Sequence, residues 1–213
     1  MEPSHIHDNI VEYLGNRRAD ARYASWDYCF NYFHRHAADP RSLCRPDRLE
    51  MSCLQLGFYL ASWGMYRGST DLLQRSARHL VPVIHTLADA PSPMWALDVD
   101  GYRQGGVEMI LGFHSTLGKV LTGATITLTT KIMLGVFGCV PAYDTQFRTG
   151  FQGATTFSRG SLGRVATFYE DHRAFVDHYR VPTLSFDTGV ETETRYTAAK
   201  VIDMIFFVEG GRG

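Results

Sequence analysis

The sequence has few residues of the kind that assemble metal centres, and those it has are scattered. Its four cysteines contain no C-x-x-C pair; they are Cys29, Cys44, Cys53 and Cys139. Structural zinc sites and iron–sulfur clusters need clustered ligands, so this spacing argues against both. We interpret the histidine pairs at 5/7 and 34/36 as ordinary side chains, the first of them in a terminus that is expected to fray. We therefore expect neither a metal nor another cofactor.

Long apolar runs are also missing. The longest uncharged run, residues 51–66, is shorter than the roughly 20 residues that a membrane-spanning helix needs. The first residues are polar and acidic before they are apolar, unlike a secretory signal. We expect a cytoplasmic protein with no membrane partner. The sequence motifs of P-loop, dinucleotide-binding, serine-hydrolase and HExxH enzymes do not occur either.

Lysine is scarce, since only Lys119, Lys131 and Lys200 occur among 21 basic residues. The other cations are arginines, whose planar guanidinium groups suit carboxylates and phosphates. A net charge of −1 excludes a strong field of one sign over the whole surface. It also weakens the case for tight non-specific binding to nucleic acid.

Hydrophobic residues with helical periodicity are abundant. They make up 45% of the 213 residues, which is enough for one sizeable core. Apolar residues on one face predict helices over four stretches, namely 72–87, 107–121, 165–179 and 196–208. We expect Pro82 to kink or divide the first of these helices.

Three further stretches decide the fold class. Residues 50–67 are apolar nearly all round, which predicts a helix buried in the middle of the fold. The β-branched stretches 124–130 and 181–186 are ambiguous, but neither has a hairpin partner beside it. We predict an all-α, compact multi-helix fold in a single domain, 1–213. Two helical lobes, packed around helices 50–67 and 126–138, are the alternative.

The stretch 127–151 carries the main functional signal. Lys131 opens an apolar run that ends at Pro141, and Asp144 follows three residues later. A carboxylate at this position has two interpretations. It can cap the helix that begins after it, or it can be the working group of an active site.

The order of Lys131, an apolar helix, Pro141, Asp144-Thr145 and Arg148 resembles the core of the helix-hairpin-helix DNA glycosylase superfamily. The resemblance implies a DNA partner and cleavage of the N-glycosidic bond of a modified or damaged base. It makes Asp144 the catalytic aspartate and places Lys131 near the lysine of the members with lyase activity.

The chain departs from the family pattern at the hairpin, which is present only as LTGATITLTTK. The distance from Lys131 to Asp144 is shorter than in the iron–sulfur members, and the cluster cysteines are absent. These departures suggest a divergent member directed at a modified or foreign base, as in defence against phages with modified DNA. The chain also resembles uncharacterised bacterial helical proteins with the blocks LQLGFYLASWGMYRGS and TKIMLGVFGCVPAYDT, a likeness that implies no activity.

The chemistry of such a reaction suits both residues. Cleaving an N-glycosidic bond builds positive charge on the sugar, which a carboxylate in apolar surroundings stabilises. An amine such as Lys131 can instead attack the sugar carbon and form a Schiff base. A lysine in an apolar helix more often extends to the surface, so Asp144 is the stronger candidate.

Two aromatic segments are candidates for the base pocket. Their candidate residues are Trp26, Asp27, Tyr28 and Asn31 in the first segment, and Gln55, Tyr59, Trp63, Tyr66 and Arg67 in the second. Such residues can stack an extruded base and read its polar edge. Aromatic packing between helices explains them equally well.

The loop arginines Arg148, Arg159 and Arg164 are candidates for binding backbone phosphates, or are solvated loop charges. The sequence thus leaves three functions open. The first is a DNA glycosylase. The second is a non-catalytic helical binding or regulatory protein in which Asp144 is only a cap. The third is a helical enzyme acting on a small nucleotide or sugar.

Overall fold

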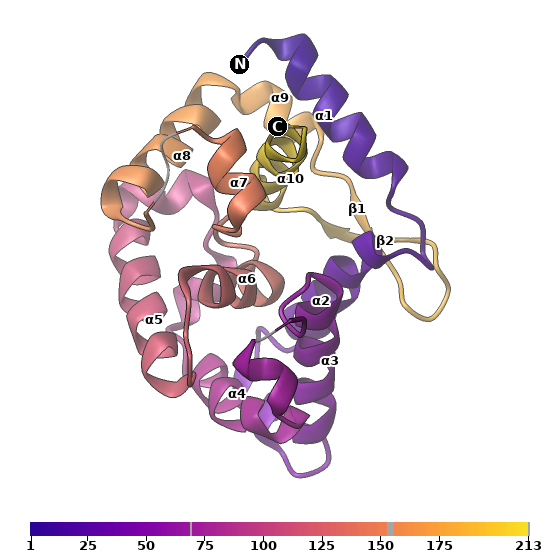
Figure 1. Ribbon diagram of the computed structural model, residues 1–213, viewed down its shortest axis with the longest axis vertical. Helices are drawn as coiled ribbons and strands as arrows, with labels where there is room; N and C mark the ends of the chain where they lie inside the picture. Colours follow the sequence, from indigo (N-terminus) through magenta and orange to yellow (C-terminus); the bar gives the residue numbers. More distant parts are fainter. Residues whose placement is uncertain (69, 153–155, 213) are drawn as a thin grey trace.

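The ends of the chain lie in the same part of the molecule, where helix α1 (Pro3–Gly15) packs against the last helix, α10 (Ala198–Gly211) (Figure 1). The computed structural model describes residues 1–68, 70–152 and 156–212. The α-helices are α1 (Pro3–Gly15), α2 (Ser25–His34), α3 (Leu49–Ser62), α4 (Val81–Ala88), α5 (Gly106–Val120), α6 (Ile126–Phe137), α7 (Thr145–Gly150), α8 (Arg159–Asp171), α9 (Arg173–His178) and α10 (Ala198–Gly211). The predicted all-α, compact fold is confirmed.

Short 3-10 turns connect several of these helices. They are η1 (Arg22–Ala24), η2 (Pro40–Cys44), η3 (Asp71–Gln74), η4 (Ala77–Leu80), η5 (Ser92–Ala96) and η6 (Val99–Gln104). One contiguous hydrophobic core includes side chains from every one of the ten α-helices, such as Ile6 of α1, Leu134 of α6 and Ile202 of α10. Helices α5 and α6, joined by the turn 121–125 in which Gly123 has a left-handed backbone, form a helix–turn–helix unit.

The helix predicted over 72–87 is wrong in its first half. Helix α4 begins only at Val81, and the residues before it form η3 and η4. Arg75 and Ser76 between these turns have extended backbones. Pro82 lies in the first turn of α4, where its missing N–H leaves no hydrogen bond unmade, so it starts the helix rather than kinking it.

Two other boundaries differ from the prediction. The helix expected over 165–179 is interrupted at His172, whose backbone leaves the helical region between α8 and α9.

The stretch 181–186 does have a hairpin partner. Strand β1 (Pro182–Leu184) pairs antiparallel with β2 (Glu191–Arg195), with Leu184 opposite Glu191. The stretch 124–130 instead enters α6, because the Thr125 hydroxyl accepts a hydrogen bond from the Leu128 N–H and caps the helix.

The buried central helix is α6, and the prediction that 50–67 occupies this position is wrong. All residues of α6 from Leu128 to Phe137 are buried. Helix α3 turns one face to solvent, where Met51, Leu54 and Phe58 are exposed. An apolar pattern all round a helix cannot show which face its neighbours cover, and here they cover only one side of α3.

Helices α7 and α10 approach each other closely through Gly150 and Gly210. A Cβ atom at Gly150 would overlap the Phe206 carbonyl, and one at Gly210 would overlap the Gln146 carbonyl. Only glycine therefore permits this backbone contact, which fixes α7 against the C-terminal helix.

Candidate active site

The turn between α6 and α7 delivers Asp144, and hydrogen bonds fix it on both sides. The Thr130 hydroxyl of α6 accepts from the Tyr143 N–H at 2.9 Å. The Asp203 carboxylate of α10 accepts from the Ala142 N–H at 2.9 Å. Because both helices hold the backbone just before Asp144, the direction of its side chain is well determined.

Asp144 is a helix cap and one half of an ion pair at the same time. Its Oδ1 accepts from the Phe147 N–H at 3.0 Å, which caps α7. Its Oδ2 lies 3.0 Å from Lys131 Nζ. The two side chains are only 5% (Lys131) and 10% (Asp144) exposed. The cap interpretation is thereby confirmed, and the second oxygen remains oriented by the lysine.

Lys131 does not extend to the bulk surface as lysines in apolar helices commonly do. Besides the bond to Asp144, its Nζ donates to the Trp63 carbonyl at 3.3 Å and lies 5.4 Å from the centre of the Trp63 ring. The Tyr59 hydroxyl donates to the Lys131 carbonyl at 3.2 Å. Tyr59 is 2% exposed and packs against α6, so its position is that of a core residue.

A second lysine–aspartate pair lies on the other helix that frames this turn. Lys200 Nζ is 3.1 Å from Asp203 Oδ2 and donates to the Tyr13 hydroxyl at 2.8 Å. It also lies 5.5 Å from the centre of the Trp63 ring. Burial lowers the pKa of Lys200, and the Asp203 charge opposes this shift. Burial likewise raises the pKa of Asp203 against the effect of Lys200.

The Lys131–Asp144 pair forms part of the wall of a cavity of about 400 Å³. Its other walls come from the end of α3 and the segment after it (residues 61–65 and Arg67), Thr127 of α6, the first residues of α7, Phe207 of α10 and Arg22 of η1. The structure thus brings together Asp144, Lys131, Trp63 and Arg67, which were expected to act together. The volume is within the range of small-molecule sites.

Sequence reasoning missed Arg22, Thr127, Gln146 and Phe207, which line the same cavity. Thr127 lies four residues before Lys131 on α6, so helical spacing could have indicated it, whereas Gln146 is only two residues after Asp144 and has no such signal. Arg22 precedes an aromatic helix in a short 3-10 turn, and Phe207 belongs to an apolar helix. Neither has a local pattern that sets it apart.

The first aromatic segment lies elsewhere and has structural partners. The Asp27 carboxylate is buried, with Arg17 Nε at 2.9 Å, the Tyr196 hydroxyl at 2.6 Å and the Leu184 N–H at 2.9 Å. Burial raises the pKa of Asp27, and the Arg17 charge opposes the shift. Its role in the structure is to hold strand β1.

The remaining residues of both aromatic segments are outside the cavity. Trp26 is fully buried and donates to the Leu134 carbonyl at 3.0 Å. Tyr28 and Asn31 line a smaller cavity of about 190 Å³ beside the β1–β2 hairpin. Gln55 lies beside Met51 on the partly exposed side of α3, and the Tyr66 ring contacts the His79 ring. One shared base pocket from both segments, as the sequence suggested, is therefore not formed.

The loop arginines also have protein partners. Arg148 Nε donates to the Asp144 carbonyl at 3.4 Å, and Arg159 forms an exposed ion pair with Glu108. Arg164 donates to the Gln152 carbonyl at 2.6 Å. None of the three lines the cavity at Asp144, and their role as phosphate ligands stays a prediction.

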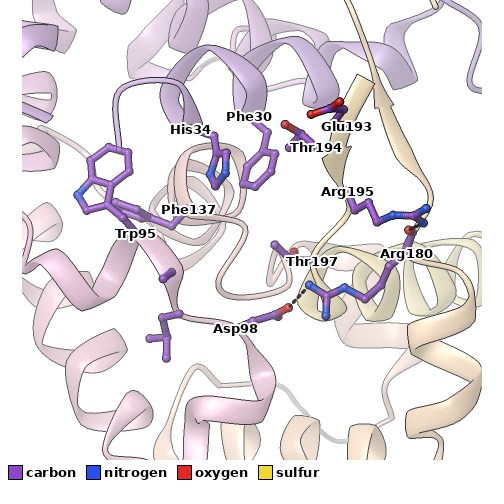
Figure 2. Close-up of a pocket in the computed structure, with 12 residues that line it drawn as sticks. Phe30, His34, Trp95, Asp98, Phe137, Arg180, Glu193, Thr194, Arg195 and Thr197 are labelled. Atoms are coloured by element: carbon purple, nitrogen blue, oxygen red, sulfur yellow. Dashed lines mark hydrogen bonds and ion pairs between the residues drawn. The ribbon is translucent and has the colours of Figure 1, made fainter. Parts of the chain in front are cut away.

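Figure 2 shows a second cavity, of about 430 Å³, between aromatic rings of α2, η5 and α6 and the end of the hairpin. Its Asp98 carboxylate accepts from the Ala198 N–H at 2.7 Å and the Ala199 N–H at 3.0 Å, and it pairs with Arg180 at 3.3 Å. Burial raises the pKa of Asp98, and the backbone N–H groups oppose the shift. The carboxylate is fully engaged in starting α10, so this slightly larger cavity offers less for chemistry than the one at Asp144.

Within the described residues, no group of three or more histidine, cysteine, aspartate or glutamate side chains is arranged to hold a metal ion. None of the described helices combines the length and hydrophobicity needed to cross a membrane. Comparisons with models of protein families, with curated proteins and with solved structures found no match.

Proposed function

We propose that this protein hydrolyses the N-glycosidic bond of a modified or damaged base in DNA, with Asp144 as the catalytic carboxylate. The observation that carries the proposal is the Lys131–Asp144 pair, which lies in the wall of an open cavity beside an indole ring. A capping aspartate needs no lysine partner. An oriented carboxylate at a cavity of nucleoside size does more than start a helix.

The reaction assigns a role to each residue around the cavity. An extruded nucleotide enters, and its base stacks on Trp63. As the C1′–N bond breaks, the base leaves with the bonding electrons and takes up a proton. Asp144 stabilises the positive charge on the sugar and accepts a proton from the water that adds to C1′. Lys131 orients the carboxylate through the 3.0 Å contact.

The test is base release from a panel of modified DNAs, including phage genomes with hypermodified cytosines. Abasic sites made by the wild type and absent with Asp144→Asn would support the proposal. Asp98→Asn is the matched control, because Asp98 is also a buried, ion-paired aspartate that caps a helix. If Asp144→Asn releases base as fast as the wild type, Asp144 is only a cap. Borohydride trapping of a protein–DNA adduct that Lys131→Gln abolishes would add lyase activity.

A small nucleotide or sugar substrate is the second candidate, and the net charge of −1 favours it over a long nucleic acid. The same panel should therefore contain free nucleosides and nucleotides. Release of base from these compounds alone would replace DNA as the substrate and leave the role of Asp144 unchanged. A non-catalytic binding protein is the outcome if no compound is cleaved.

A further inference from the structure

Two arginines at the cavity differ from most arginines of this chain. Of the 18 arginines, 14 donate a hydrogen bond or form an ion pair, whereas Arg22 and Arg67 have neither among the described residues. Both are exposed, and both line the cavity that contains Asp144. Their guanidinium donors are therefore available to a ligand in that cavity.

Both arginines lie near the segment that carries Trp63. The Arg22 guanidinium lies 5.3 Å from the centre of the Trp63 ring. The Arg67 side chain lies against Gly64, the residue after Trp63. Asp144 neutralises Lys131, and no other acidic residue among those that the structure describes lines the cavity, so the two guanidinium groups give it an excess positive charge.

The geometry points to a phosphate subsite. We infer that Arg22 and Arg67 each bind one of the two phosphodiester groups that flank the nucleotide whose glycosidic bond faces Asp144. Planar guanidinium groups match phosphate oxygens with two parallel hydrogen bonds, and the Trp63 indole in the wall of the same cavity suits the attached base. The inference rests on the proposed function for its substrate. It assigns phosphate binding to Arg22 and Arg67 instead of the loop arginines Arg148, Arg159 and Arg164.

The inference also limits the number of phosphates that the protein contacts. Because the net charge is −1 and most other arginines are engaged by protein groups, the energy of DNA binding is concentrated at this cavity. Two phosphate contacts predict a slope of about −2 for log K against log salt concentration, far below that of proteins contacting an extended backbone.

The experiment is fluorescence anisotropy with a short labelled duplex that contains one central tetrahydrofuran residue, which no glycosylase can cleave. Arg22→Gln and Arg67→Gln should each weaken binding about tenfold and make the salt slope shallower by about 0.9. Arg173→Gln is the matched control, because Arg173 is also exposed and has no hydrogen bond or ion pair among the described residues, but lies outside the cavity. Its affinity and slope should equal those of the wild type.

Two results would overturn the inference. In the first, both cavity variants bind the duplex with the salt slope of Arg173→Gln. In the second, a free deoxynucleoside monophosphate competes as strongly as the duplex and depends on the same arginines, which would make the ligand a small nucleotide.

The two proposals fail separately. Weaker DNA binding by the arginine variants, with no base released from any DNA, overturns only the glycosylase. Base release that is unchanged in both variants, with unchanged binding, overturns only the phosphate subsite.

Discussion

Replacing Asp144 by asparagine separates the cap from the ion pair. The asparagine Oδ1 can still accept the Phe147 N–H, since asparagine caps helices as well as aspartate does. The amide NH₂ then faces Lys131 Nζ in place of Oδ2, so the ion pair is lost. Lys131 keeps the Trp63 carbonyl and the face of the indole.

The burial of the Lys131–Asp144 pair determines how much stability the Asp144→Asn variant is expected to lose. Removing one partner of a fully buried pair costs about 3–5 kcal/mol, while an exposed pair contributes about 1 kcal/mol or less. The Lys131–Asp144 pair is 5% and 10% exposed at the wall of an open cavity, so solvent screens part of its energy. We expect Asp144→Asn to lower the free energy of unfolding by about 2 kcal/mol, intermediate between these limits. Asp144→Ala also loses the cap and should cost about 3 kcal/mol.

Urea unfolding followed by circular dichroism measures both differences, provided that the slope against urea is unchanged. Lys131→Met combined with Asp144→Asn should cost less than the two single changes added together, because neither charge is then left without its partner. Equal stability of Asp144→Asn and wild type would refute the reasoning, since it would mean that the pair contributes nothing. Equal loss in Asp144→Asn and Asp144→Ala would refute the assignment of the cap.

Two further predictions concern packing and pH. Gly210→Ala should destabilise the protein by about 3 kcal/mol, because its Cβ would overlap the Gln146 carbonyl. Gly163→Ala has open space in α8 and should be neutral or stabilising. Thermal unfolding of these two variants tests the prediction. Burial raises the pKa of four tyrosines well above 10, namely Tyr13, Tyr59, Tyr102 and Tyr196. Since the folded pKa is the higher one, their stabilisation is complete below pH 10 and is lost as pH rises, by about 5 kcal/mol per pH unit for all four. The tyrosinate absorbance of these four residues should therefore appear together with loss of helix above pH 10, and ionisation of all 11 tyrosines in a still folded chain would contradict the prediction.

Local periodicity was enough to locate helices whose apolar face and caps agree. Helix α5 begins one residue before the predicted 107–121 and ends at Val120, and α6 matches the expected 126–138 to within one residue. Strand β2 could not be found in this way. Its alternating residues Thr192 and Thr194 are half-buried but polar, and no apolar signal marks the strand. Its partner β1 is held by Asp27, 157 residues away along the chain.

The site was only partly predictable for a similar reason. Trp26 and Trp63 occur in equally aromatic segments, but the Trp26 indole is sealed against the Leu134 carbonyl, while Trp63 is half-buried at the cavity. Long-range contacts distinguish the two tryptophans, and the sequence does not show those contacts. Arg22 was missed because the feature that singles it out, having no hydrogen bond or ion pair among the described residues, is not recorded by any sequence pattern.

The position of Asp144 depends on α10 as much as on its own segment. The Ala142 N–H donates a hydrogen bond to Asp203, whose charge is balanced by Lys200. Gly210 of the same helix allows α7 to pack closely against α10. A resemblance confined to the stretch 127–151 therefore covers the residues that would react, but not those that orient them. A variant that loses the Asp203 contact should displace the turn before Asp144 without replacing any residue that lines the cavity. Such a variant would lower base release while leaving the arginine-dependent binding of DNA intact, and so would separate orientation of Asp144 from recognition of the strand.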